Sequence, residues 1–188
     1  MLMNICVVQT RKILRIILFV SVVAHVSSPA LSKTQLFKTK YYKVIVDLLA
    51  DNLDHPWGLA FLPNDIPLIS ERSGKLKIIS QGGGWKTIAG VPNVWAEGQG
   101  GLLDIAIHPK FSKNQIIYLS YSEPSKDGKT AGTALAYGHL ELSTNPRLHD
   151  TRVIFSQNKK TDSGRHFGSR IIIAPDDSLF LTVGDRGD

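Results

Sequence analysis

One pattern repeats three times along this chain and limits the folds open to it. Each copy is a short apolar run, a turn that begins with a proline, and a second short apolar run, with the prolines at Pro63, Pro109 and Pro175. Runs this short favour antiparallel β-strands over helices. The spacings of 46 and 66 residues fit one propeller blade of about 40–50 residues and one blade with an inserted loop. The repeat therefore predicts a β-propeller rather than an ordinary β-sandwich.

Further alternating runs supply the other strands that such blades need. Apolar and polar residues alternate in the segment 75–79 and, imperfectly, in 42–49, as they do in half-buried strands. The segments 133–142 and 151–156 supply two further strands. The polar, lysine-rich stretch 33–41 is expected to be a mobile lead-in, and Trp57 is expected in the core. Since no segment has the period of an amphipathic helix, the sequence predicts an all-β chain. About two and a half to three blades of four-stranded antiparallel sheet would account for it.

Residues 1–32 have the pattern of a secretory signal. Three basic residues between positions 11 and 15 precede an apolar run from Ile16 to Val26, which is too short to span a bilayer. The small-x-small sequence Ala-Leu-Ser at 30–32 predicts cleavage, so the mature chain would begin near Lys33 and be periplasmic or secreted. Cys6 is the only cysteine and would leave with the signal. The mature chain would then have neither a disulfide nor a cysteine-based metal site.

Charge also bears on the partners. The predicted signal holds three of the 22 basic residues and none of the 16 acidic ones, so its removal would halve the formal net charge of +6. The remaining chain has no basic stripe with interleaved aromatic residues, which argues against nucleic acid as a partner. No membrane span is expected after removal of the signal. His55, His108 and His149 lack the spacing of metal ligands, so no metal site is predicted within these 188 residues.

The last 24 residues carry the clearest chemical signal. Two short apolar runs, 171–173 and 179–183, flank the turn sequence Pro-Asp-Asp-Ser and predict an antiparallel hairpin. His166 stands before the first run and Asp185 after the second, so the hairpin would bring them to the same end of one small sheet. A histidine beside a carboxylate is suited to general-base catalysis. The alternative is that Asp185 caps a turn and His166 is a surface loop residue.

Three segments, in the same order, resemble the soluble PQQ-dependent glucose/sorbosone (aldose sugar) dehydrogenase family. They are HPWGLAFLP at 55–63, EGQGGLLDIAIHP at 97–109 and RHFGSRIIIAPDDSLFLTVGDRGD at 165–188. The resemblance covers nearly all of the chain from about Tyr42 onward. It implies a six-bladed β-propeller, of which residues 33–188 look like the N-terminal part.

The resemblance also implies roles for individual residues. His166 would be the general base that takes the proton of a sugar hydroxyl while hydride passes to PQQ, and Asp185 would orient it. Gln99 would line the same pocket, unless it is only a loop-bonding amide. Arg165 could face the PQQ carboxylates, unless it is a solvated loop arginine. Arg186 lies where the family places loop residues of the sugar pocket.

The same resemblance leaves much of the cofactor site outside these residues. Most cationic PQQ ligands, and the calcium ligands, are expected beyond residue 188, so the chain alone is expected to be inactive. The sugar and the electron acceptor are not specified by the sequence. An alternative function is a non-catalytic propeller that serves as a binding module, because one fold can host many functions.

Overall fold

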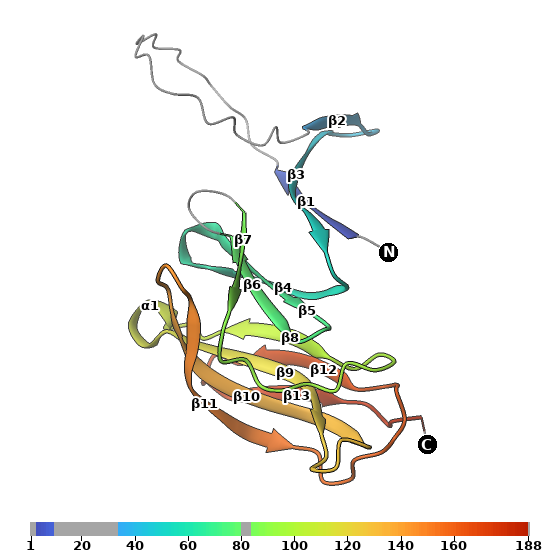
Figure 1. The fold of residues 1–188 in the computed structure, drawn as a ribbon. Coiled ribbons are helices and arrows are strands. Elements are labelled where there is room, and N and C mark those ends of the chain that lie inside the picture. The colour runs from blue at the N-terminus through green and yellow to red at the C-terminus, as the bar shows by residue number, and fades with distance from the viewer. Residues whose placement is uncertain (1–2, 10–33, 80–83, 188) are drawn as a thin grey trace. The chain divides into compact units, whose positions relative to one another are not determined.

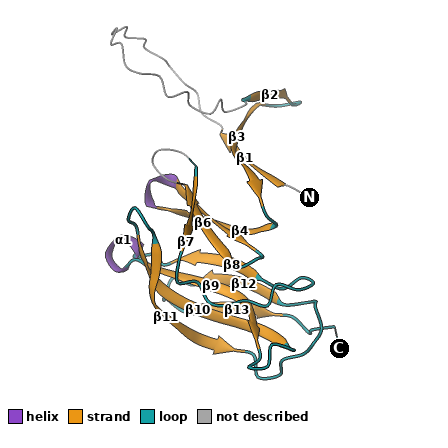
Figure 2. Cartoon of the chain, in the orientation of Figure 1, coloured by secondary structure: helices purple, strands orange, loops and turns teal. Residues whose placement is uncertain are grey.

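A computed structural model describes residues 3–9, 34–79 and 84–187 of the chain. They belong to two units, residues 1–53 and residues 54–188. In the described part, strands dominate and the helices are limited to a 3₁₀ turn, η1 (Pro63–Asp65), and one short helix, α1 (Phe111–Asn114) (Figures 1 and 2). The predicted all-β class is confirmed.

The first unit contains a three-stranded antiparallel sheet. Its strands are β1 (Met3–Gln9), β3 (Lys43–Leu53) and β2 (Gln35–Lys38), in the order β1-β3-β2. Strand β3 confirms the strand predicted at 42–49. The lead-in predicted at 33–41 is wrong, because β2 pairs with β3 through a tight turn in which the Thr39 amide donates to the Tyr42 carbonyl (2.8 Å). The predicted signal, apart from β1, lies outside the described residues and stays a prediction.

The second unit is built from antiparallel meanders. The first sheet runs in the order β4 (Pro56–Leu62), β5 (Ile66–Glu71), β6 (Lys75–Ile79) and β7 (Trp85–Ile88). The second contains β8 (Leu102–Ile107), β9 (Ile116–Pro124), β10 (Ala131–Glu141) and β11 (Arg147–Ser156), again as sequential neighbours. Strands β12 (Gly168–Ile173) and β13 (Leu179–Val183) form a third sheet. Two four-stranded blades and half of a third confirm the partial propeller.

The three proline-led turns connect the strand pairs as the repeat predicts. They join β4 to β5, β8 to β9, and β12 to β13. Each turn holds a non-glycine residue in the left-handed region, with φ of 67° at Asn64, 55° at Gln115 and 65° at Asp177. Asparagine and aspartate tolerate this region better than most residues, which explains their presence in two of these turns.

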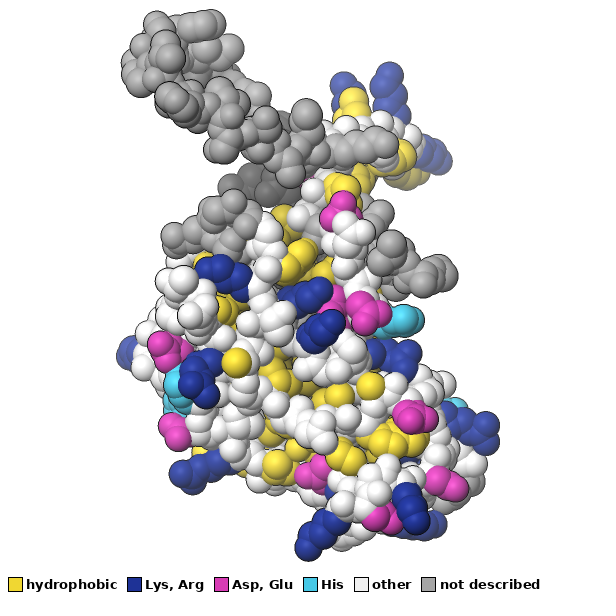
Figure 3. All heavy atoms as spheres, in the orientation of Figure 1, with side chains coloured by type: hydrophobic (Ala, Val, Ile, Leu, Met, Phe, Trp, Pro, Cys, Tyr) yellow, Lys and Arg dark blue, Asp and Glu magenta, His cyan; other side chains and the backbone are white. Residues whose placement is uncertain are grey.

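The core of the second unit lies between its first sheet, β4–β7, and its second sheet, β8–β11. Strand β8 packs against β4 and β5, and buried aliphatic side chains of both sheets form one cluster. Trp57 does not belong to it, contrary to prediction. Strand β4 alternates, so Gly58 and Leu62 are buried whereas Trp57 is 38% exposed, with the Arg170 guanidinium 5.9 Å from its ring centroid. On the face drawn in Figure 3, acidic and basic side chains are interspersed among apolar ones.

Buried polar side chains tie adjacent sheets together. Ser70 on β5 accepts from the Gly58 amide (2.8 Å) and donates to the Leu103 carbonyl of the second sheet. Asp104 on β8 accepts from the Ile171 amide (2.8 Å) and from the Arg170 guanidinium (3.0 Å) of the third sheet. These bonds fix the third sheet, and therefore the hairpin that carries His166 and Asp185, against the second.

Candidate active site

Three loops meet beside the second and third sheets. Residues 95–101 lead into β8, residues 157–167 connect β11 to β12, and residues 184–187 follow β13. The Gln99 amide donates to the Gly164 carbonyl (2.6 Å), and the Gly184 amide donates to the Phe167 carbonyl (3.2 Å). The loops are therefore in direct backbone contact, and each of them carries at least one of the residues predicted for the site.

The hairpin β12–β13 brings His166 and Asp185 together. His166 Nδ1 lies 2.8 Å from Asp185 Oδ1. The side chains are about half and two-thirds exposed, 50% and 65%, so the pair lies at the surface of the second unit and can be reached by a ligand. The predicted contact is present, and the catalytic roles of both residues stay predictions.

A β-bulge decides which residue faces His166. Ile171 lies opposite Leu181, but Gly168 lies opposite Val183, so the register shifts by one between these pairs. Continuing the inner register would have placed Gly168 opposite Gly184, and His166 opposite Arg186. The bulge contains Ser169, whose φ is 82°. An extra residue in one strand thus selects a carboxylate rather than a cation as the partner of the imidazole.

The carboxyl of Asp185 is held in its ionised form. The backbone N–H of Gly187, 2.8 Å from Oδ1, and then the His166 ring lower the pKa of this carboxyl below its usual range. An ionised carboxylate can only accept hydrogen bonds, so His166 Nδ1 must carry the proton of the contact. His166 Nε2 is then the atom that can accept a proton from a ligand.

Gln99 is bonded to the histidine loop by both its backbone and its side chain. Its Oε1 accepts from the His166 amide (2.9 Å), in addition to the contact of its own amide with Gly164. The side-chain amide therefore bonds one loop to another, as expected of a loop-bonding amide. The NH₂ end of the side chain carries the donors that a pocket role would need.

Arg165 precedes the histidine, and its side chain is exposed. Its positive charge is among the weaker causes that lower the pKa of Asp185, after the Gly187 amide and the His166 ring. This places the guanidinium in the same electrostatic environment as the pair. Both predicted possibilities for Arg165, a solvated side chain and a contact with an anionic ligand, are compatible with its exposure.

The backbone around the pair is strained and closely packed. His166 itself has a φ of 55°, a region that a residue with a Cβ occupies at a cost of about 1–2 kcal/mol. A Cβ at Gly184 would come within 1.8 Å of the His166 carbonyl oxygen, and one at Gly98 within 2.3 Å of the Gly164 oxygen. Glycine is therefore required at both positions by close backbone approach.

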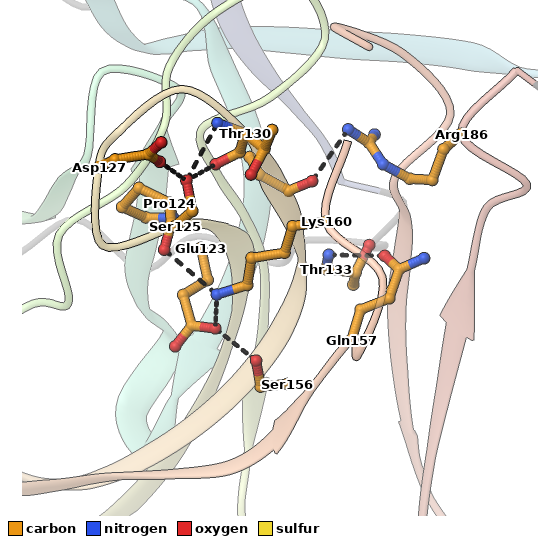
Figure 4. Close-up of polar contacts among 11 residues, drawn as sticks. Glu123, Pro124, Ser125, Asp127, Thr130, Thr133, Ser156, Gln157, Lys160 and Arg186 are labelled. Carbon is orange, nitrogen blue, oxygen red and sulfur yellow. Dashed lines mark hydrogen bonds and ion pairs between the residues drawn. The ribbon is translucent and has the colours of Figure 1, made fainter. Parts of the chain in front are cut away.

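The loop that leads to His166 is anchored by polar side chains (Figure 4). Lys160 Nζ donates to Glu123 Oε2 (2.6 Å) and to the Pro124 carbonyl (3.2 Å) at the end of β9, and the Thr133 amide donates to Gln157 Oε1 (3.0 Å). Burial raises the pKa of Glu123, but hydrogen bonds from Lys160 and Ser156 outweigh it, so the pKa is below its usual range.

Two arginines near the site were missed or misplaced by sequence reasoning. Arg186 was expected with the sugar-pocket loop, but it is 2% exposed and donates to the Arg165 carbonyl. Arg72, at the end of β5, was not singled out at all, and it donates to the carbonyls of Gly98 and Gly100. Arg186 has a φ of 64° in a turn after β13, so the alternation of an extended strand does not predict its burial.

The chemistry of the described residues is compatible with one edge of a PQQ molecule. PQQ carries three carboxylates, and the site offers one exposed guanidinium, Arg165, and the amide donors of Gln99, beside a histidine. This donor set matches part of such an anion. Within residues 3–9, 34–79 and 84–187, no group of three or more His, Cys, Asp or Glu side chains could hold a metal ion.

Comparisons with known proteins agree on one family. The family model described as Glucose / Sorbosone dehydrogenase matches residues 53–188. The aldose sugar dehydrogenase YliI of Escherichia coli (strain K12) is 46% identical over 145 residues, which cover 76% of this chain and 38% of that protein. Quinoprotein glucose dehydrogenase B of Acinetobacter calcoaceticus is 30% identical over 179 residues, or 84% of this chain and 34% of that protein.

A solved structure shows the same fold. The PQQ-bound form of the aldose sugar dehydrogenase from Streptomyces coelicolor superposes with a TM-score of 0.65 at 26% identity, over 85% of this chain and 44% of that one. The chain thus spans less than half of the length of each of these proteins. No helix in the described part of the chain is long and apolar enough to cross a membrane.

Proposed function

Because this chain belongs to the glucose/sorbosone dehydrogenase family, we propose that it supplies the general base of an enzyme that oxidises an aldose sugar with PQQ. The observation that carries the proposal is the 2.8 Å contact between His166 Nδ1 and Asp185 Oδ1 at an exposed meeting point of three loops. That PQQ is the cofactor is supported by similarity to a quinoprotein and to a PQQ-bound dehydrogenase.

The proton step follows from the geometry of the pair. A sugar hydroxyl within hydrogen-bond distance of His166 Nε2 would lose its proton to that atom as the carbon is oxidised. The imidazole then carries a positive charge, which the adjacent Asp185 carboxylate stabilises. Asp185 also keeps the Nδ1 proton in place, so that Nε2 is always the accepting atom. PQQ, when bound, would accept the hydride from the sugar carbon.

Gln99 and Arg165 would hold the ligands at this edge. The NH₂ group of Gln99 can donate to an oxygen of the cofactor or the sugar, while its Oε1 stays on the His166 amide. The exposed guanidinium of Arg165 can pair with a carboxylate of PQQ. We expect further cationic ligands and calcium ligands in the part of the propeller that the longer relatives contain beyond the matched region.

Export is part of the proposal. The basic and apolar pattern of residues 1–32 supports a signal peptide, with a mature chain that begins near Lys33 in the periplasm or outside the cell. N-terminal sequencing of the exported protein tests this directly. A mature protein that retains Met1 would contradict it.

The experiment for the proposed chemistry compares two histidine variants of the complete protein. His166→Ala should lower turnover with an artificial electron acceptor by about 10²–10⁴-fold, while a PQQ titration remains close to wild type. His149→Gln is the matched control, because His149 pairs with Glu141 on the second sheet, away from the three loops. Near wild-type turnover of His166→Ala with PQQ bound would show that His166 is not the base, whereas a wild-type protein that oxidises no sugar would favour the non-catalytic binding module.

A further inference from the structure

Arg186 holds the backbone that leads into His166 and packs against the side chain that follows it. Its guanidinium donates to the carbonyls of Ser163 and Arg165, which precede the histidine, and to the Ala131 carbonyl (3.3 Å). The guanidinium carbon lies 3.5 Å from the ring centroid of Phe167, which follows the histidine. The Arg186 side chain is only 2% exposed, so these contacts of its charged group lie inside the protein, beneath the loop.

Arg72 also donates to backbone carbonyls, and these lie on both sides of Gln99. Its Nε donates to the Gly100 carbonyl (3.1 Å), and a second nitrogen donates to the Gly98 carbonyl. The Arg72 carbonyl in turn accepts from the Leu102 amide (3.2 Å). The loop that carries Gln99 is thus attached to the end of β5 at three points.

The two loops that these arginines hold meet at a single junction. Gln99 Oε1 accepts from the His166 amide, and the Gln99 amide donates to the Gly164 carbonyl. His166 occupies the left-handed region, which persists only when surrounding contacts determine it. Neither loop has regular secondary structure at these residues. Side-chain donors to the flanking carbonyls therefore supply the constraint that a strand or helix would supply elsewhere.

We propose that Arg72 and Arg186 are positioning residues that set the place and the ring orientation of the general base, acting through the Gln99–His166 junction. The proposal rests on the proposed function of His166. Neither arginine side chain needs to contact the sugar or the cofactor for this role. Each arginine fixes carbonyls next to a site residue, on both sides of Gln99 for Arg72 and before His166 for Arg186. Its loss would therefore let that residue move without removing any reacting group.

Lysine cannot replace either arginine in this role. A guanidinium presents several donors in a fixed planar fork, whereas an ammonium is a compact point charge on a flexible stem. Arg186→Lys and Arg72→Lys keep the charge but would satisfy fewer of the flanking carbonyls. A displacement of about 1 Å can cost on the order of 10²-fold in rate. We therefore expect each variant of the complete, PQQ-loaded protein to lose about 10-fold or more in kcat.

A double variant tests whether the arginines act through one junction. If both loosen the same contact, the combined loss in kcat should be clearly smaller than the product of the two single losses. Arg152→Lys is the control, because Arg152 is an exposed residue of strand β11 and takes part in none of the loop contacts described above; its kcat should change less than two-fold. Fully multiplicative losses would contradict a shared junction and overturn the paired role.

A second measurement does not depend on sugar oxidation. Ring ¹⁵N signals of His166, assigned by their loss in His166→Gln, report whether Nδ1 or Nε2 carries the proton. Wild type should show protonated Nδ1, and Arg186→Lys should show a mixture of the two tautomers. If wild type oxidises no sugar, the proposed function fails, and the tautomer comparison still decides the positioning role. If Arg186→Lys does not fold, Arg72→Lys gives the same test from the other loop. Wild-type tautomer and kcat in the folded variants would overturn the proposal.

Discussion

Asp185 uses one oxygen, Oδ1, for two hydrogen bonds. It accepts from the Gly187 amide (2.8 Å) and from the His166 ring (2.8 Å). The backbone donor therefore fixes which atom of the side chain faces the imidazole. An asparagine in this place would keep its carbonyl oxygen toward both donors, since its NH₂ group cannot accept from the Gly187 amide.

This geometry predicts the outcome of Asp185→Asn. The Nδ1–H tautomer of His166 should persist, but the negative charge that stabilises the imidazolium is lost. Turnover of the complete protein should fall on the order of 10-fold, less than the roughly 10²–10⁴-fold expected for loss of the base. Asp185→Ala, which removes both bonds, should cost more than Asp185→Asn. Steady-state sugar oxidation measures both, and equal losses in the two variants would contradict the argument.

At the scale of the elements, close backbone approach is required where the loops cross. Gly98 has a φ of 56° and lies against the Gly164 carbonyl, whereas Gly128 has a φ of 72° in a turn where a Cβ would meet no atom within 4 Å. The two glycines share a left-handed backbone and differ in their surroundings. They form a matched pair that separates the cost of conformation from the cost of contact.

Alanine at each glycine should therefore have different effects. Gly128→Ala should lower the free energy of unfolding by about 1 kcal/mol, from the left-handed backbone alone. Gly98→Ala should lower it by more and should also lower turnover, because the loop that holds Gln99 must shift away from Gly164. Thermal unfolding and sugar oxidation of the complete protein check the pair. The same stability loss in both variants, with full activity, would show that the approach is not constrained.

The anchor between Lys160 and Glu123 gives a pH dependence. Burial raises the pKa of Glu123, but the bonds from Lys160 and Ser156 oppose this, and the net change is a lowering of the pKa. A carboxyl whose pKa is lowered in the native state stabilises the fold fully at pH values above its pKa in the unfolded chain, near 4.3. This stabilisation is lost as the pH falls through the native pKa. Glu123→Gln should thus reduce the unfolding free energy by on the order of 1 kcal/mol at neutral pH.

That difference between wild type and Glu123→Gln should shrink as the pH falls below about 4. Unfolding midpoints measured between roughly pH 3 and pH 7 report it. Glu141→Gln is the control, because its pair with His149 is largely exposed and exposed pairs contribute little. A difference that is the same at every pH would mean that the Glu123 charge is not what stabilises the loop.

Individual elements show what sequence reasoning can and cannot reach. Strand β6 was predicted with its observed bounds because 75–79 alternates cleanly. Strand β7 was missed because it is four residues long, and only Trp85 and Ile88 are large apolar residues. Strand β2 was missed because its side chains are all exposed, so the lysines that flank it suggested a mobile segment. Its existence depends on pairing with β3, which local sequence does not reveal.

The candidate site also has a part that the sequence predicts and a part that it does not. The nearness of His166 and Asp185 follows from a hairpin that the sequence predicts, and the predicted contact is present at 2.8 Å. Burial of Arg186 and the role of Arg72 depend on carbonyls that become neighbours only when three loops meet. Residues that contact backbone carbonyls leave no pattern in the sequence, because any residue can provide a carbonyl.

For the whole molecule, large apolar side chains stay exposed on the first and third sheets. Phe180 is 61% exposed and Ile172 57% on the third sheet, and Phe61 is 47% and Leu59 43% exposed on β4 of the first. Exposed apolar groups of this size are usually covered by a partner surface or by more of the same protein. Propeller blades bury such faces against their neighbours, and the longer relatives have the length for more blades.

Residues 33–188 produced alone should therefore be poorly stable and inactive. We expect a broad thermal transition, binding of a hydrophobic dye, and no sugar oxidation after addition of PQQ. The complete protein, measured under the same conditions, should unfold cooperatively and bind little dye. Cooperative unfolding of the isolated segment together with PQQ-dependent oxidation would contradict this prediction.

The bulge in β12 determines which changes of chain length the third sheet can accept. Residues inserted in the turn 174–178 would lengthen the far end of the hairpin and leave Gly168 opposite Val183. Deletion of one residue between Gly168 and Ile171 would restore a regular ladder with Gly168 still opposite Val183. Deletion of one residue between Val183 and Asp185 would instead bring Arg186 opposite His166. Natural or engineered homologues should thus vary in length at the turn or in the bulge, and keep a constant count of residues from His166 to Gly168 and from Val183 to Asp185.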